Sequence, residues 1–197
     1  MQINIGSKAL VFAAMMAALG NVLSFLSTQL APIAPNIPLG PVSVSLAIDL
    51  SHLTTFIAAL FGGPIIGGVT GLVGGFVAAF EFGFSKGNLI TGFGLPLGKA
   101  MTGVAAGYLF KVLYKNGSLT STIATTISSY LPEAVLTYVL FRYLLPPVMG
   151  VTEAIGVAIV TPILVKAFAE MIVLGIILAG VVNNLGFKSY AQGYFSQ

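Results

Sequence analysis

The chain has 197 residues, of which 57% are hydrophobic and only 7% are charged, and its formal net charge is +3. Because soluble domains carry about 25% charged residues, this composition excludes an ordinary soluble protein. It predicts a single all-α membrane domain, residues 1–197, with room for about six spans of ~20 residues. There is no cysteine and only one histidine, which excludes disulfides, iron–sulfur clusters and thiol nucleophiles and argues against a metal centre. We expect neither a metal nor a cofactor.

The first predicted span covers residues 7–28. No small-residue cleavage site follows it, so we interpret it as a retained span and not as a signal peptide. Small residues that permit close helix contact repeat along it in two adjacent rows: Ala9, Ala13 and Ala17, with Ala14 and Ala18 beside them. Two interpretations stay open, namely internal packing and a docking face for another protein.

The next stretch, residues 29–48, begins with four prolines and a glycine that exclude a helix up to Pro41. From Val42 to Ile48 apolar and small polar residues alternate, which predicts an extended segment leading inward. A proline-rich loop of this length is more than a connection requires. We interpret it as an outer lid or as part of a binding surface.

A hairpin of two short spans, residues 49–61 and 64–82, follows the loop. Asp49 is placed to cap the first helix by accepting from the amides of Ser51 and His52, and His52 is positioned to bond to Asp49 or to a ligand. Gly62-Gly63-Pro64 predicts the turn, with proline at the start of the second helix. A row of small residues then predicts a flat strip for close packing against neighbouring helices: Gly63, Gly67, Gly71, Gly75 and Ala79.

Three longer spans complete the prediction, at residues 93–114, 118–145 and 161–184. The first repeats the small-residue row with Gly94, Gly98, Thr102 and Ala106. Ser118 is a plausible N-cap of the second. A link of residues 146–160 precedes Thr161-Pro162, which has the form of an N-cap followed by proline at the first helical position.

The basic residues predict the orientation. Six spans place both termini on one side, together with Lys8, Lys111, Lys115 and Lys188, whereas Lys86 and Arg142 lie on the other side. Since basic residues are enriched in cytoplasmic loops, this bias of four against two favours cytoplasmic termini.

Charged residues inside the spans are the main functional signal, because each costs roughly 2.5–3.5 kcal/mol at mid-bilayer unless it faces a partner or a cavity. They gather in the outer half of the last three spans: Lys99, Glu133, Arg142, Lys166 and Glu170. One interpretation is an ion-pair network that pins the helices together. The other is a polar pocket open to the outside, to which Asn88 and His52 would add. A proton relay is less consistent, because no acidic residue lies in the inner half of these spans.

At this point the sequence resembles the substrate-binding (S) components of energy-coupling factor (ECF) vitamin transporters. The resemblance rests on IDLSHL at 48–53, FGGPIIGGVTGLVGG at 61–75, GKAMTGVAAGYLFK at 98–111 and AAMMAA at 13–18. After the serine, many relatives have an acidic residue and then a proline, where this chain has His52 and Thr54. The ligand of the riboflavin-type members is therefore only a loose indication of the ligand of this chain. The histidine-bearing N-terminus of the nickel and cobalt members is absent from MQINIGSKAL, and we therefore expect no metal substrate.

The resemblance implies a mechanism. Such a component captures a scarce micronutrient from outside, between its last three helices and under the loop joining its first two. It docks through the alanine row of its first helix onto a membrane coupling (T) protein that carries two ATP-binding-cassette ATPases. This chain lacks a G-x-x-x-x-G-K-[ST] loop, so the ATPases are the partners that would use ATP, and the chain itself is not an enzyme.

The sequence therefore predicts a plasma-membrane S component that binds a small water-soluble vitamin or related precursor, with the lipid bilayer as its surroundings and no nucleic-acid partner. The alternative is a membrane scaffold or assembly protein with no transport substrate, in which the charged cluster is purely structural. A small intramembrane enzyme is less consistent with one histidine, no cysteine and no G-x-S-x-G elbow.

Overall fold

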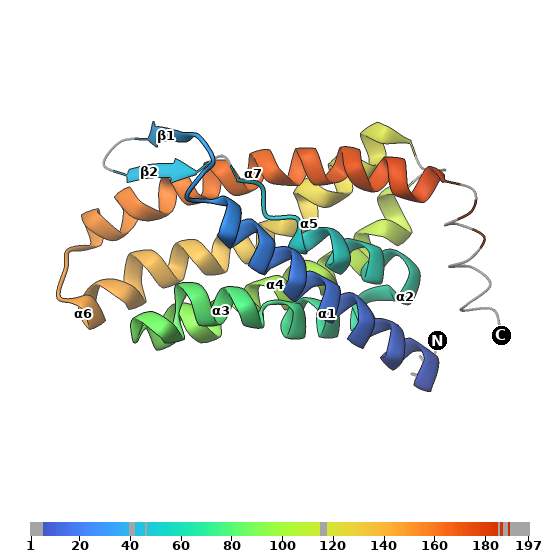
Figure 1. Ribbon diagram of the computed structural model, residues 1–197, viewed down its shortest axis with the longest axis horizontal. Helices are drawn as coiled ribbons and strands as arrows, with labels where there is room; N and C mark the ends of the chain where they lie inside the picture. The colour runs from blue at the N-terminus through green and yellow to red at the C-terminus, as the bar shows by residue number, and fades with distance from the viewer. Residues whose placement is uncertain are drawn as a thin grey trace.

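The computed structural model describes residues 6–39, 42–45, 47–114, 118–184, 186 and 189. Within them the chain forms an elongated helical bundle, in which the start of the first helix and the end of the last lie at the same end (Figure 1). Four helical segments of this part of the chain are long and apolar enough to cross a membrane: Ser7–Leu30, Ser51–Lys86, Leu89–Leu113 and Glu153–Asn183. These segments make the chain a multi-pass membrane protein.

Helix α1 (Ser7–Leu30) is followed by a short turn and by the only two strands among the described residues. Strands β1 (Asn36–Leu39) and β2 (Val42–Ser45) pair antiparallel, with Asn36 opposite Ser45. The prolines stop α1 because they have no N–H for a helical bond, and the predicted extended stretch is confirmed over Val42–Ser45. Gly40, Pro41 and Leu46 of the predicted lid lie outside the described residues.

Helix α2 (Ser51–Gly74) is broken at Gly63, which has φ 78° and ψ −171°. Only glycine adopts this backbone region without strain. The two arms then double back: a Cβ at Gly67 would lie 2.7 Å from that of Ala59, and Gly20 of α1 contacts both Ser51 and Gly74. The predicted turn at Gly62-Gly63-Pro64 is therefore confirmed. The second arm continues into α3 (Phe76–Phe82) and the 3₁₀ turn η1 (Phe84–Lys86).

The predicted cap of α2 is only partly correct. Asp49 Oδ1 accepts a hydrogen bond from the amide of Ser51 at 2.9 Å, but the structure has Leu50 at the N-cap position and no side-chain cap. Asp49 therefore lies just outside the helix, in a segment that enters the bundle beside α7.

The small-residue strips meet where α2 packs on helix α4 (Leu89–Leu113). A Cβ added to Gly71 would overlap the Lys99 carbonyl, and one added to Gly103 would overlap the Gly67 carbonyl. The backbones of the two helices are therefore in direct contact, as the spacing of the small residues predicts. Gly63 does not belong to the strip, because it forms the kink.

Two helix starts are set by polar caps. Asn88 Oδ1 accepts from the amides of Ile90 (3.1 Å) and Thr91 (3.2 Å), so α4 begins at Leu89 and not at residue 93. The expected N-cap of α5 (Leu119–Val139) is confirmed, because Ser118 Oγ accepts from the Ser121 amide at 3.3 Å. The chain continues through a π-helical turn, η2 (Leu140–Leu144), into α6 (Leu145–Met149).

Helix α7 (Glu153–Asn183) begins at Glu153 and not at Thr161, where the sequence predicts its start. Pro162 lies inside this helix, and the Thr161 hydroxyl donates to the Val157 carbonyl at 2.8 Å beside it. Membrane helices tolerate an internal proline when neighbouring helices, side chains or small local adjustments satisfy the backbone group that it frees. The N-cap-and-proline pattern was therefore misleading. The six-span count and the orientation remain predictions, and Lys115 and Lys188 lie outside the described residues.

Candidate functional site

A buried polar network joins α2, α4 and α5. Glu133 Oε2 lies 3.1 Å from His52 Nε2 and accepts from the Thr102 hydroxyl at 2.5 Å. Burial of an ionisable side chain is costly unless its polar atoms are bonded, and Glu133 is only 6% exposed. The His52 ring also meets Tyr130 edge-on, with centroids 6.1 Å apart. These contacts pack the start of α2 against the middle of α5.

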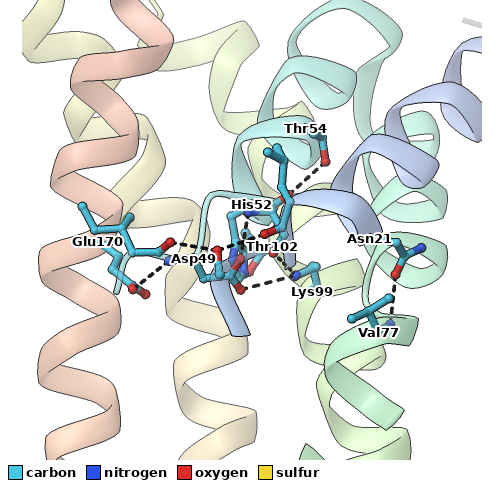
Figure 2. Close-up of polar contacts among 12 residues, drawn as sticks. Asn21, Asp49, His52, Thr54, Val77, Lys99, Thr102 and Glu170 are labelled. Atoms are coloured by element: carbon cyan, nitrogen blue, oxygen red, sulfur yellow. Dashed lines mark hydrogen bonds and ion pairs between the residues drawn. The ribbon is translucent and has the colours of Figure 1, made fainter. Parts of the chain in front are cut away.

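Lys99 extends the network toward the segment before α2. Its ammonium donates to Ser51 Oγ at 2.5 Å and lies 4.0 Å from Asp49 Oδ2, while only 4% of the residue is exposed. Figure 2 shows Asp49 between Lys99 and Glu170. The buried network, defined here as Ser51, His52, Lys99, Thr102 and Glu133, is thus bonded largely to itself. This is the arrangement expected if the charged groups form an ion-pair network that holds the helices together.

A second charged group lies where the segment before α2 meets α7. The amide of Asp49 donates to Glu170 Oε1 at 3.0 Å, and Lys166 Nζ lies 3.3 Å from the same oxygen. Lys166 and Glu170 are one turn apart on α7, as their spacing predicts. The Lys166 and Asp49 side chains remain 30% and 31% exposed, so this group is open where the buried network is closed.

These three charged residues line a cavity of about 200 Å³. Its other described lining residues are Ser24, Ser27, Thr28, Ala31, Ala47, Phe82, Ile163 and Ala167. The walls therefore come from the last two turns of α1, the segment before α2, the end of α3 and the first half of α7. A concave site with a few converging polar groups is the usual form of a small-molecule site.

The location of the cavity differs from the expectation that the last three spans enclose the pocket. Of those helices only α7 contributes described lining residues, and none comes from α4 or α5. The physical reason is that Lys99 and Glu133 are held by Ser51, His52 and Thr102. The predicted cluster is therefore divided, with Lys166 and Glu170 at the cavity and Lys99, Glu133 and His52 in the buried network.

Two further candidates are not among the described residues that line the cavity. Asn88 caps α4 and stands eleven residues before Lys99, which is about 16 Å along a helix. Arg142 lies in η2, donates to the Tyr138 hydroxyl at 2.6 Å and approaches Glu153 at 3.7 Å. Its guanidinium also stacks on Tyr143, 4.9 Å from the ring centroid. Neither residue lines the cavity.

The alanine row of α1 is divided in the same way. Ala13 and Ala17 are each 1% exposed, and Ala17 packs on the backbone of Gly74 in the second arm of α2. The structure therefore corrects the expectation that these two form a docking face, because their small side chains are used for internal packing. Ala9 is half-buried, whereas Ala14 and Ala18 are exposed.

Sequence reasoning assigned Asp49 only a capping role and did not select the α1 hydroxyls. A signal was present: Ser24, Ser27 and Thr28 follow a helical i, i+3, i+4 spacing in an otherwise apolar span, which places them on one face. Polar residues on one face of a membrane helix indicate a cavity or a partner.

The comparison with known protein families gives one finding. A family model described as "ECF transporter, substrate-specific component" matches residues 8–182. No curated protein and no solved structure matches the chain. The match extends over nearly the whole chain, including the cavity and the buried network.

Proposed function

Since the chain belongs to the family of ECF transporter substrate-specific components, we propose that it captures a small water-soluble vitamin or related micronutrient from outside the cell for ATP-driven uptake. The carrying observation is the cavity lined by Asp49, Lys166 and Glu170. Charged side chains within an apolar bundle that border a space and keep free donors and acceptors are what a polar guest would bind.

The proposal includes six spans, cytoplasmic termini and location in the plasma membrane. The arms of α2 on either side of Gly63 would then be two spans, and α5 would be a span whose polar residues face inward. Thr122, Thr125 and Ser129 of α5 are buried, and each hydroxyl donates to a carbonyl one turn back, which makes a Thr- and Ser-rich helix compatible with lipid. With cytoplasmic termini, the cavity lies toward the outside, because its α1 residues are in the last two turns.

The proposed partners are a membrane coupling protein and two ATPases, which would supply the energy. For docking we propose the exposed side of α1, with Ala14 and Ala18 as its small residues, in place of the buried Ala13 and Ala17. Lys166 and Glu170 are the proposed ligand-binding residues together with Asp49. The buried network would support them from behind, by fixing Asp49 and the start of α2.

The test is the release of small molecules from the gently purified full chain, followed by mass spectrometry. We expect one enriched compound, and we expect Ala31→Phe, which fills the cavity without changing its charge, to abolish its retention. Ala105→Phe, at a half-buried α4 position outside the cavity lining, controls for the added ring. Equal retention by the wild type and a folded Ala31→Phe variant would contradict the proposed site, and no retained compound would favour the scaffold alternative.

A further inference from the structure

The cavity presents opposite charges on different elements, and this distribution bears on the class of ligand. Asp49 lies in the segment before α2, whereas Lys166 and Glu170 project from α7. Three hydroxyl-bearing residues of α1, Ser24, Ser27 and Thr28, also line the cavity. The charged residues among the described lining are therefore two carboxylates and one ammonium.

Each of these groups keeps unused bonding capacity. An ammonium has three donors, and the bond of Lys166 to Glu170 uses one of them. Glu170 accepts both of its bonds through Oε1, so that Oε2 has no partner among the described residues. Asp49 Oδ1 accepts from Ser51, while Oδ2 is 4.0 Å from Lys99. Free donors and free acceptors thus both border the cavity.

This pattern discriminates between ligand classes. A simple anion would meet two carboxylates, and a simple cation would offer no acceptor to the two donors of Lys166 that its bond to Glu170 leaves over. An apolar ligand would cover the spare donors of Lys166 and the free oxygen of Glu170 without bonding to them, which is costly. Only a ligand that carries both an anionic and a cationic group bonds to the spare donors and to the free acceptors at the same time. The volume of about 200 Å³ is below the ~300–1,000 Å³ typical of drug-sized ligands, so the ligand is small.

We infer that the cavity binds a small zwitterion, whose anionic group lies against Lys166 and whose protonated amine lies against the carboxylates of Asp49 and Glu170. The inference rests on the proposed function, because it names the chemical class of the substrate. In this arrangement the ligand bridges α7 and the segment before α2, the two elements that the amide of Asp49 already connects.

The experiment sorts the possible ligands by charge. Growth-medium and cell extracts are separated into four fractions: amphoteric compounds, retained by a cation exchanger in acid and by an anion exchanger in base, then cations only, anions only, and neutral compounds. The full chain in lipid nanodiscs is incubated with each fraction, and native mass spectrometry records any added mass. We expect an adduct from the amphoteric fraction. An adduct only from another fraction overturns the inference but leaves the proposed function, whereas no adduct from any fraction overturns both.

Two charge-removing variants test the two ends of the ligand separately. Lys166→Gln and Glu170→Gln each remove the charge but keep a polar side chain, and glutamine at 170 still offers an oxygen to the amide of Asp49. We expect each to weaken the adduct by about tenfold or more, because each removes a charged partner. Lys111→Gln, near the end of α4, and Glu81→Gln, on α3, are matched controls outside the cavity and should retain it. Loss in only one of the two cavity variants, with both folded, would show a ligand with one charged end and overturn the inference.

Discussion

The backbone amide of Asp49 donates to Glu170 Oε1 at 3.0 Å, across 121 residues of sequence. This bond attaches the segment before α2 to the middle of α7, on the wall of the cavity. The segment before α2 and the helix that carries Lys166 and Glu170 thus meet at one carboxylate oxygen, which Lys166 Nζ approaches at 3.3 Å as well.

Removal of that acceptor should loosen the segment. In the ligand-free protein we expect Glu170→Ala to increase hydrogen exchange at the Asp49 amide by about tenfold, because one hydrogen bond contributes roughly 0.5–1.5 kcal/mol. Glu170→Gln should change the exchange little, since its amide oxygen still accepts. Exchange mass spectrometry of the 47–50 region is the measurement, and equal protection in all three proteins would show that the bond does not hold the segment.

Glu133 should matter more for stability than for direct ligand contact. We expect Glu133→Gln to destabilise the fold by about 1–3 kcal/mol, because it removes the buried charge beside His52 and puts an amide N–H₂ donor in place of the second carboxylate oxygen. Thermal unfolding in nanodiscs is the measurement. Glu81→Gln, outside the network, should stay within about 0.5 kcal/mol of the wild type. An unchanged melting temperature for Glu133→Gln would argue that the network does not pin the helices.

The glycine contact between α2 and α4 predicts a strong position dependence. Gly71→Ala places a methyl group against the Lys99 carbonyl, and such overpacking costs about 1–3 kcal/mol. Gly180 of α7 is the matched control, because nothing lies within 4 Å of a Cβ there, and alanine is favoured over glycine in a helix by about 1 kcal/mol. We therefore expect opposite shifts in melting temperature. Similar shifts would mean that the two helices separate easily.

Substitutions on the two sides of α1 should have different effects: those on the buried side should lower stability, and those on the exposed side should lower transport. We expect Ala17→Leu to lower stability by about 1–3 kcal/mol, because Ala17 is only 1% exposed and its backbone lies against Gly74. Ala14→Leu changes an exposed position and should leave stability and ligand binding intact, while uptake by cells expressing the coupling partners falls about fivefold or more. If uptake is unchanged in Ala14→Leu, the docking surface lies elsewhere.

The sequence predicted the fold well where a local cause was decisive. Gly63 followed by Pro64 marks a break, and the small residues spaced by four mark a backbone contact, because no larger side chain fits there. The start of α7 was missed because Thr161-Pro162 matches a helix start locally, whereas membrane surroundings allow a helix to continue through proline.

The candidate site was only half predictable for a different reason. Composition and position show that Lys99, Glu133, Lys166 and Glu170 need partners, but not which partners they find. Which partners they find depends on how the segment before α2 enters the bundle. The position of Asp49 at the cavity is likewise set by the tertiary fold. Its contacts with Lys99 and Glu170 join residues far apart in sequence, which no local pattern encodes.

The backbone contact of α2 with α4 also has a mechanical consequence. Helices that touch through glycine cannot slide past each other without collision, so this pair should behave as one rigid body during transport. Because α1 also touches α2 through Gly20 and Gly74, it belongs to the same body, and any rearrangement that admits or releases a guest is then left to the joint between Asp49 and α7. The moving part of the protein would thus be the contact between the segment before α2 and α7, and the helices that touch through glycine would stay fixed.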